Sequence, residues 1–335
     1  MLKGLYFIKK FSRLFVFLII FLFLAWLLSR GKVYEKNELI YGITFSPKQA
    51  SSLDLDWQDL FIKILDELKV NNLRLVAYWN EVEKENNKYD WNDLDWEVAE
   101  AAKRDAKVIL AVGGRLPRWP ECHYPNWTES LNKKQKQTEN LEYIAETIKR
   151  YRGNDNIIAW QIENEPFLSH FGECPELDKN FLDQEIALAE SLDQPPIVVT
   201  DSGELSFWIP AARRGDIFGT TMYRDTYSKV LHSYVHYPIG PGFFRFKKNI
   251  TNLFADPQKW MVIELQAEPW GPKQFQDLSQ TERDKTMNLE KFKDILEFSR
   301  QAGFKEFYLW GVEWWYWEKI KNNNPAIWEE AKKIF

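Results

Sequence analysis

The chain has 335 residues, a formal net charge of −5 at pH 7 and 16% aromatic residues. Residues 1–32 contain six Lys or Arg and no acid, so the remaining residues together carry −11. An acidic body without a basic tract excludes nucleic acid as a partner, and the length suits one large domain.

The first predicted element is an apolar run of fifteen residues, Leu14–Leu28, which has basic residues on both sides. No small-residue cleavage site follows the run, which favours an uncleaved signal anchor over a cleaved signal peptide, with a buried core helix as the third possibility. The basic residues before the run place the N-terminus in the cytoplasm. We therefore predict a transmembrane anchor in residues 1–32 and an extracytoplasmic, membrane-tethered domain in residues 33–335.

Strand-like and helix-like segments alternate through the rest of the chain. Short runs of β-branched and aromatic residues, bounded by Gly, Pro, Asn or Asp, predict eight strands. They are Ile40–Phe45, Leu73–Tyr78, Lys107–Val112, Ile157–Glu163, Pro196–Thr200, Ile217–Met222, Trp260–Glu264 and Glu306–Trp310. Apolar residues at helical spacing predict helices between them. These are Asp56–Val70, Trp91–Ala106, Thr138–Tyr151, Leu177–Leu192 and Ser279–Ala302, with a final helix at Pro325–Phe335.

This alternation predicts an α/β protein, a (β/α)8 TIM barrel preceded by one N-terminal hydrophobic anchor helix. An open, doubly wound sheet is the alternative. That fold usually carries a Gly-rich phosphate loop after its first strand, whereas Tyr41–Pro47 contains only Gly42. The long segment between Met222 and Trp260 is predicted to be an irregular loop, because Gly240-Pro241-Gly242 interrupts it.

Two glutamates follow apolar runs at the ends of two predicted strands. Trp160–Pro166 reads Trp-Gln-Ile-Glu-Asn-Glu-Pro, and Met261–Gln266 reads Met-Val-Ile-Glu-Leu-Gln. In barrels of this kind the reactive side chains lie at the carboxyl ends of the strands. A pair of carboxyl groups facing one opening is what hydrolysis of a glycosidic bond requires. The pair therefore predicts a glycosidase with Glu165 and Glu264 as its catalytic residues.

The strand-four motif closely resembles the Asn-Glu-Pro motif of clan A retaining glycoside hydrolases, the cellulase- and β-galactosidase-like barrels. The resemblance implies that Glu165 is the acid/base, that Glu264 is the nucleophile and that Asn164 binds the sugar 2-hydroxyl. It further implies that Arg74 orients the nucleophile. Tyr223 would hydrogen-bond it, and Trp310 would form a sugar platform. No cofactor is implied, and the expected partner is a carbohydrate.

Two other acids lie close to the proposed pair. Alternation along the strand places Glu163 on the same side as Glu165 but deeper, as a hydrogen-bonded supporting residue. Glu268 falls in the following loop and is the alternative nucleophile. Several tryptophans follow predicted strands and are expected to line the cleft, because aromatic rings bind the apolar faces of sugars. They are Trp79, Trp119, Trp127, Trp270, Trp314 and Trp315.

Cysteines and histidines are few. Cys122 and Cys174 are either a disulfide, as an extracytoplasmic location favours, or two separate free thiols. His232 and His236 have metal-like spacing but no acidic third ligand nearby, and no metal site is predicted.

The leading interpretation is a retaining O-glycoside hydrolase or transglycosylase acting by double displacement on an oligo- or polysaccharide outside the cytoplasm. A glycan-binding barrel without turnover is the alternative, and a barrel enzyme using metal or phosphate is the third. The sequence does not set the oligomeric state, the sugar or the linkage.

Overall fold

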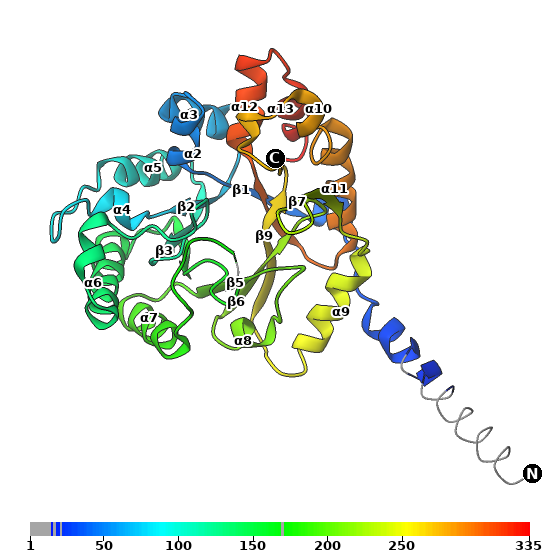
Figure 1. Cartoon of the computed structure of the whole chain (residues 1–335), viewed down its shortest axis with the longest axis horizontal. Helices are drawn as coiled ribbons and strands as arrows, with labels where there is room; N and C mark the ends of the chain where they lie inside the picture. Colours follow the sequence, from blue (N-terminus) through cyan, green and yellow to red (C-terminus); the bar gives the residue numbers. More distant parts are fainter. Residues whose placement is uncertain (1–14, 16–17, 21, 169–170) are drawn as a thin grey trace, which may run out of the picture.

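Eight parallel strands close into a barrel in the computed structural model, which describes residue 15 and residues 18–20, 22–168 and 171–335. The strand order around the barrel is β1-β10-β9-β6-β5-β4-β3-β2. The strands are β1 (Ile40–Thr44), β2 (Asn72–Val76), β3 (Lys107–Val112), β4 (Ile157–Ile162), β5 (Ile197–Asp201), β6 (Ile217–Met222), β9 (Lys259–Gln266) and β10 (Glu306–Trp310). The helices surround them (Figure 1). The predicted (β/α)8 barrel is confirmed, and its closure rules out an open sheet.

Helices connect the strands on the outside of the barrel. They are α2 (Pro47–Ser52), α3 (Trp57–Asp66), α4 (Trp79–Val82), α5 (Asn92–Ala102), α6 (Lys133–Tyr151), α7 (Lys179–Leu192), α8 (Ile209–Ala212), α9 (Pro241–Thr251), α10 (Gln280–Arg283), α11 (Leu289–Gln301), α12 (Val312–Lys321) and α13 (Ala326–Ala331). The 3-10 turns are η1 (Lys36–Glu38), η2 (Asn126–Ser130) and η3 (Phe275–Asp277). Asp56 caps α3 by accepting hydrogen bonds from the backbone N–H groups of Gln58 and Asp59.

The single helix predicted over Ser279–Ala302 is wrong in its continuity. Ser279 caps α10, which ends at Arg283, and the chain leaves the helix before α11 begins. The Asn288 side chain accepts a hydrogen bond from the Lys291 N–H at 2.9 Å and starts α11. A cap residue inside the predicted helix thus begins a second helix, which apolar spacing alone does not reveal.

The segment between β6 and β9 is ordered rather than an irregular loop. It contains an antiparallel hairpin of β7 (Asp225–Ser228) and β8 (Ser233–His236), in which Tyr227 and Tyr234 pair with ring centroids 5.3 Å apart. Gly240 then caps α9, and Pro241 occupies its first turn. Proline has a favourable φ there and no N–H to leave unpaired, so this Gly-Pro-Gly sequence opens a helix.

The barrel interior is divided along its axis. A small apolar cluster fills one end: Ile109, Ala159, Val198, Ile217, Met261, Ile263 and Tyr308. Gln161 and Glu264 come after Ala159 and Ile263 along their strands and are buried. Polar groups therefore gather toward the carboxyl ends of the strands, the end at which barrel enzymes place their chemistry.

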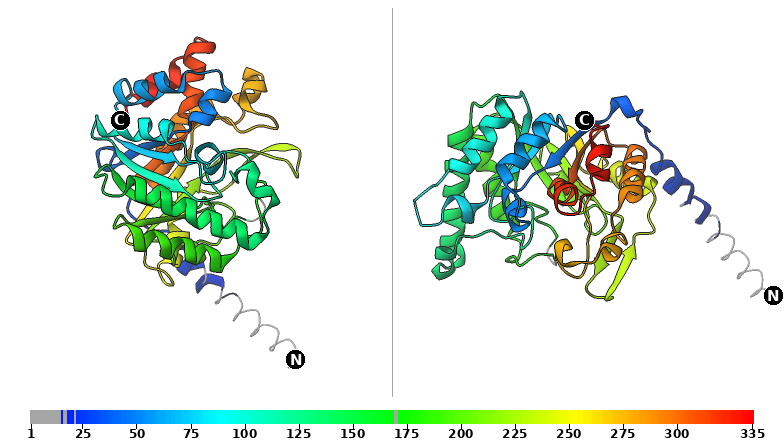
Figure 2. Two further views of the ribbon diagram at one scale, coloured as in Figure 1. Left: turned by 90° about the vertical axis from the view of Figure 1, so that its left-hand side faces the viewer. Right: turned by 90° about the horizontal axis from the view of Figure 1, so that it is seen from above.

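The N-terminal segment leaves the barrel beside α9 (Figures 1 and 2). The Asn249 amide donates to the carbonyl oxygens of Leu28 and Arg30, and Arg245 donates to that of Ser29. None of the helices in the described part of the chain combines the length and apolar content needed to cross a bilayer. Residues 1–14, 16–17 and 21 of the predicted anchor lie outside the described residues, and the anchor stays a prediction.

Candidate active site

Glu165 lies in a turn immediately after β4. Asn164 donates its backbone N–H to the carbonyl of Arg115 at 2.7 Å, and the Glu165 N–H donates to the Thr200 hydroxyl of β5 at 2.8 Å. Glu163 and Glu165 have φ angles of 58° and 44°, a left-handed backbone that is uncommon for residues other than glycine. Side chains held in this way by neighbouring strands often belong to functional sites.

Glu264 lies inside β9, two residues before the strand ends, rather than at its end as predicted. Val262 and Leu265 pack in the outer core between barrel and helices, whereas Ile263 packs inside the barrel. The pairings of β9 with both β6 and β10 shift register at this point. This β-bulge turns Glu264 into the barrel together with Ile263, although strict alternation would have placed Glu264 outside.

Arg74 connects the two motifs that carry Glu165 and Glu264. Its side chain is fully buried and donates to Glu264 Oε1 at 2.8 Å, Asn164 Oδ1 at 2.7 Å and Gln161 Oε1 at 2.8 Å. Tyr223 donates its hydroxyl to the other oxygen, Glu264 Oε2, at 3.0 Å. Both oxygens of Glu264 thus receive a hydrogen bond, and one of the two donors is a cation.

Glu165 has negative groups as neighbours, whereas Glu264 is paired with Arg74. Its pKa is raised well above the ordinary carboxyl value, first by burial and then by the negative charges of Glu264, Glu121 and Asp201. Within the described residues its carboxyl group accepts no hydrogen bond. The two carboxyl groups of the pair thus have unlike surroundings, as the division between a general acid and a nucleophile requires.

Glu163 and Glu268 have other partners. Glu163 accepts the backbone N–H groups of Gly114 and Arg115 at 2.7 and 2.6 Å, so it supports the loop after β3, not a deeper layer of the barrel. Glu268 accepts hydrogen bonds from the Trp310 indole at 2.8 Å and from Arg118 at 2.5 Å. Glu268 lies two residues past β9 and pairs with Arg118, whereas Glu264 lies inside the strand and pairs with Arg74.

Glu121 is a third carboxyl group in the site and was missed from the sequence. It lies in the loop between β3 and α6 and is 6% exposed. It accepts a hydrogen bond from Asn164 Nδ2 at 3.1 Å. Burial, followed by the charge of Glu264, raises its pKa to about 8. No sequence motif marks Glu121, because it lies in an irregular loop whose path depends on the rest of the fold.

Four aromatic rings form a row leading from the surface to Glu264. Trp119 is 44% exposed and lies 6.1 Å from Phe171, Phe171 lies 5.7 Å from Trp270, and Trp270 lies 5.3 Å from Tyr223 between ring centroids. Trp310, at the end of β10, is largely buried, and the Arg118 guanidinium covers its ring at 4.0 Å. Exposed and half-buried rings of this kind suit the apolar faces of sugars.

Three of the predicted cleft tryptophans are core residues, so that part of the prediction is wrong. Trp79 is 0% exposed, donates to Glu83 Oε2 at 2.7 Å and stacks on Tyr143. Trp314 is 1% exposed and packs against Phe275. Both follow strands, but they begin or lie within the short helices α4 and α12, whose turns direct them into the outer core. Trp315, also fully buried, belongs to the same core.

A disulfide joins the loops that flank Glu165. Cys122 and Cys174 are bonded, with their Cα atoms 5.3 Å apart. The Glu173 N–H also donates to the carbonyl of Pro120 at 2.9 Å. At Gly172 a Cβ atom would approach Glu121 Cβ to 2.6 Å, so only glycine allows this close contact between the loops. The loop that carries Glu121 is therefore fixed against the loop after β4.

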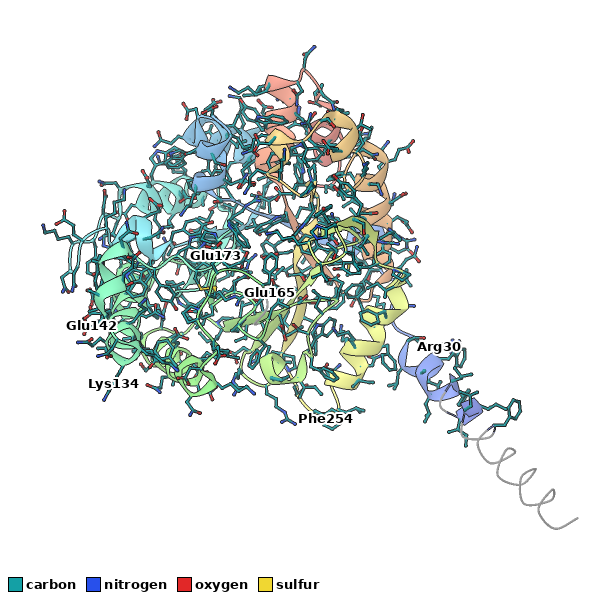
Figure 3. The ribbon with its side chains drawn as sticks, viewed as in Figure 1. Arg30, Lys134, Glu142, Glu165, Glu173 and Phe254 are labelled. Carbon is teal, nitrogen blue, oxygen red and sulfur yellow. A yellow bond between two sulfur atoms is a disulfide. The ribbon has the colours of Figure 1, made fainter. Side chains whose placement is uncertain are left out.

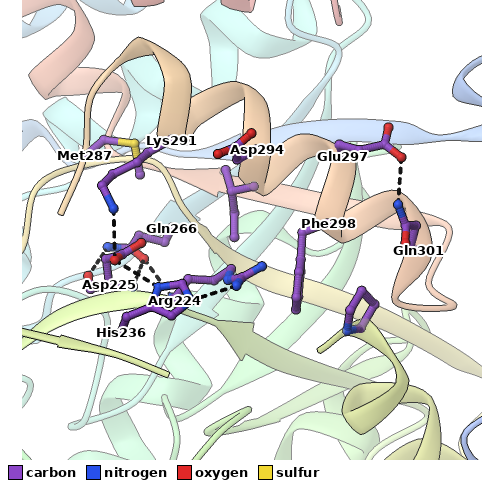
Figure 4. A pocket seen from close by; sticks show the side chains of 12 residues that line it. Arg224, Asp225, His236, Gln266, Met287, Lys291, Asp294, Glu297, Phe298 and Gln301 are labelled. Atoms are coloured by element: carbon purple, nitrogen blue, oxygen red, sulfur yellow. Dashed lines mark hydrogen bonds and ion pairs between the residues drawn. The ribbon is translucent and has the colours of Figure 1, made fainter. Parts of the chain in front are cut away.

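A second hollow, between the β7–β8 hairpin and α11, lacks both glutamates of the pair (Figure 4). Its polar groups bind one another: His236 and Lys291 both contact Asp225, at 3.1 and 3.0 Å. His236 is thus part of an ion network, and His232 is exposed on the hairpin turn. Across the described residues, no three His, Cys, Asp or Glu side chains gather in a way that could hold a metal ion.

Residues 48–182 match the family model Cellulase (glycosyl hydrolase family 5). No curated protein sequence shows significant similarity to the chain.

Solved structures share the fold at low sequence identity. A glycosylated family 10 endo-β-1,4-xylanase from Gloeophyllum trabeum is 16% identical, with a TM-score of 0.56 over 82% of this chain and 84% of the xylanase. Xylanase 10B from Thermotoga maritima is 14% identical, with a TM-score of 0.55 over 90% and 97% of the two chains. An exo-β-1,4-mannosidase from Opitutaceae bacterium strain TAV5 is 15% identical, with a TM-score of 0.56 over 81% and 51%. Together with the family match, they confirm the predicted resemblance to clan A glycoside hydrolases.

Proposed function

We propose that this protein is a retaining glycoside hydrolase in which Glu165 is the acid/base and Glu264 the nucleophile. The observation that carries the proposal is the pair of unlike carboxyl groups in one barrel mouth. Burial and neighbouring negative charges raise the pKa of Glu165, whereas Glu264 is held by Arg74 and Tyr223. In Figure 3, Glu165 lies at the centre of the ring of strands and helices.

The reaction would proceed in two displacements. Glu165 gives its proton to the glycosidic oxygen while a Glu264 oxygen attacks the anomeric carbon, and the aglycone leaves. Glu165, now ionised, removes a proton from an incoming water, whose oxygen displaces Glu264 and restores both groups. A sugar hydroxyl in place of water would make the same site a transglycosylase. Asn164, held by Arg74, is placed to bind the 2-hydroxyl of the reacting sugar.

The substrate we propose is an oligo- or polysaccharide, bound in part by the aromatic row. The test is a panel of β-linked glycans incubated with residues 33–335, with NMR of the products in the first minutes. We expect release of new reducing ends whose anomeric configuration is that of the substrate. Products of inverted configuration would contradict the double displacement. Glycan binding without any product would favour the binding-barrel alternative.

We also propose that residues 1–32 tether the domain to a membrane with the barrel on the extracytoplasmic side. The support is the apolar run Leu14–Leu28 and its basic flank. We expect the full chain to sediment with membranes and to resist carbonate extraction, whereas residues 33–335 should stay in the supernatant. Protease added to intact cells or spheroplasts should digest the barrel. A full chain that is extracted like the truncated one would contradict the anchor.

A further inference from the structure

We propose that Glu121 selects substrates that carry a free amino group at C2 of the reacting sugar. This inference rests on the proposed function, because it takes Asn164 as the residue beside C2. It assigns the site a substrate class, glycosides of 2-amino-2-deoxy sugars, and gives a role to a carboxyl group that the two displacements do not use.

The position of Glu121 follows from the orientation of the Asn164 amide. Arg74 Nη2 donates to Asn164 Oδ1 at 2.7 Å, which fixes the carbonyl side of the amide. The NH2 side then donates to Glu121 Oε2 at 3.1 Å. One N–H of Asn164 remains for the sugar, and the Glu121 carboxyl group lies beside it. A substituent at C2 that reaches Asn164 therefore also meets Glu121.

A cation bound at this point would be stabilised by the acidic groups around it. Glu121, Glu165 and Glu264 are each at most 6% exposed. Glu264 is among the causes that raise the pKa of both other groups. Two cations lie nearby, and both already have partners. Arg74 donates to Glu264, Asn164 and Gln161, and Arg115 donates to the carbonyl oxygens of Leu168 and Phe171. Glu165 accepts no hydrogen bond from any residue that the structure describes. An ammonium group on the substrate would offset this repulsion.

The loop that carries Glu121 also fixes the position of this residue. Its backbone φ of 75°, the Cys122–Cys174 bond next to it and the contact with Gly172 fix its loop on both sides. The loop holds the Glu121 carboxyl group in place, so it loses little freedom on binding, and an ammonium beside it would favour its ionised form and add an ion pair. A 2-hydroxyl or a 2-acetamido group brings no positive charge to Glu121, and the acetamido group also adds an acyl group that needs room.

The test compares nitrophenyl glycosides that differ only at C2, bearing a hydroxyl, an amine or an acetamide, in the gluco, galacto and manno series. We expect the wild-type kcat/KM to be about tenfold or more higher for the amine in the series that is turned over, because an ion pair with Glu121 is gained. Glu121→Gln should remove this preference by lowering kcat/KM for the amine substrate more than for the hydroxyl substrate.

The matched control is Glu173→Gln, which removes an exposed carboxylate from the loop that is disulfide-bonded to the Glu121 loop. It should leave the preference intact. Equal wild-type rates for amine and hydroxyl substrates would overturn the inference. So would an equal loss on both substrates in Glu121→Gln, which would make Glu121 only a positioning residue for Asn164.

Binding separates this inference from the proposed function. Calorimetric titration of Glu264→Gln with β-1,4-linked trisaccharides of glucosamine, glucose and N-acetylglucosamine measures the preference without turnover. Tighter binding of the glucosamine trisaccharide, lost on adding Glu121→Gln, would support the inference even if no substrate were hydrolysed. Hydrolysis of neutral glycosides with no preference for the amine in either experiment would overturn the inference and leave the proposed function standing.

Discussion

Replacing Glu264 by glutamine is expected to lower kcat about 10⁴- to 10⁶-fold, the range seen when a nucleophile is removed from a catalytic unit. Glutamine is nearly isosteric: its oxygen can accept from Arg74 while its NH2 group donates to the Tyr223 hydroxyl, so the site should keep its geometry. The free energy of unfolding should change little, since a buried ion pair is lost together with the repulsion between Glu264 and Glu165. Steady-state kinetics and chemical denaturation measure the two effects.

Two further variants show whether the loss is chemical. Glu264→Ala leaves room for azide, which should restore turnover and yield a glycosyl azide with the anomeric configuration opposite to that of the substrate. Arg74→Met should instead destabilise the fold by about 3–5 kcal/mol, because it leaves buried carboxylates without their cation. Activity retained in Glu264→Gln and lost in Glu268→Gln would move the nucleophile to Glu268.

Replacing Glu165 by glutamine is expected to lower kcat/KM about 10²- to 10⁴-fold for substrates with poor leaving groups, the usual contribution of a general acid. For a dinitrophenyl glycoside, whose leaving group needs no proton, kcat/KM should change far less. In that case the covalent intermediate accumulates, because deglycosylation still lacks its base, and a burst of nitrophenolate is expected. A uniform loss across leaving groups would contradict the acid/base role.

The pH dependence follows from the raised pKa of Glu165. The group must be protonated to act as an acid, so wild-type activity should fall as the pH rises through that pKa, and this alkaline limb should vanish in Glu165→Gln. The same pKa shift affects stability with a definite sign. A carboxyl group whose pKa is higher in the folded state costs stability as the pH rises above its unfolded value. Glu165→Gln should therefore unfold at higher denaturant concentration than wild type at neutral and alkaline pH.

Local sequence patterns predict most of the scaffold. All eight barrel strands coincide with predicted segments to within a few residues, because buried parallel strands are continuous apolar runs with turn residues at both ends. Arg74 lies between Leu73 and Leu75, which face the outer core, so alternation alone turns its side chain inward. The helices around the hairpin were harder to predict from the sequence. Residues such as Asn288 and Gly240-Pro241 can begin a helix or form a turn, and their surroundings in the fold decide which.

The sequence by itself therefore determined the barrel, its eight strands and the two motifs that carry Glu165 and Glu264, since these depend on apolar periodicity and short-range spacing. The tertiary structure alone decided which side chains meet. The bulge in β9 turns Glu264 inward against the strand alternation, and the disulfide-linked loop brings Glu121 to Asn164. The turns of α4 and α12 bury Trp79 and Trp314. These outcomes depend on pairing and packing between segments far apart in the chain, and no local pattern records them.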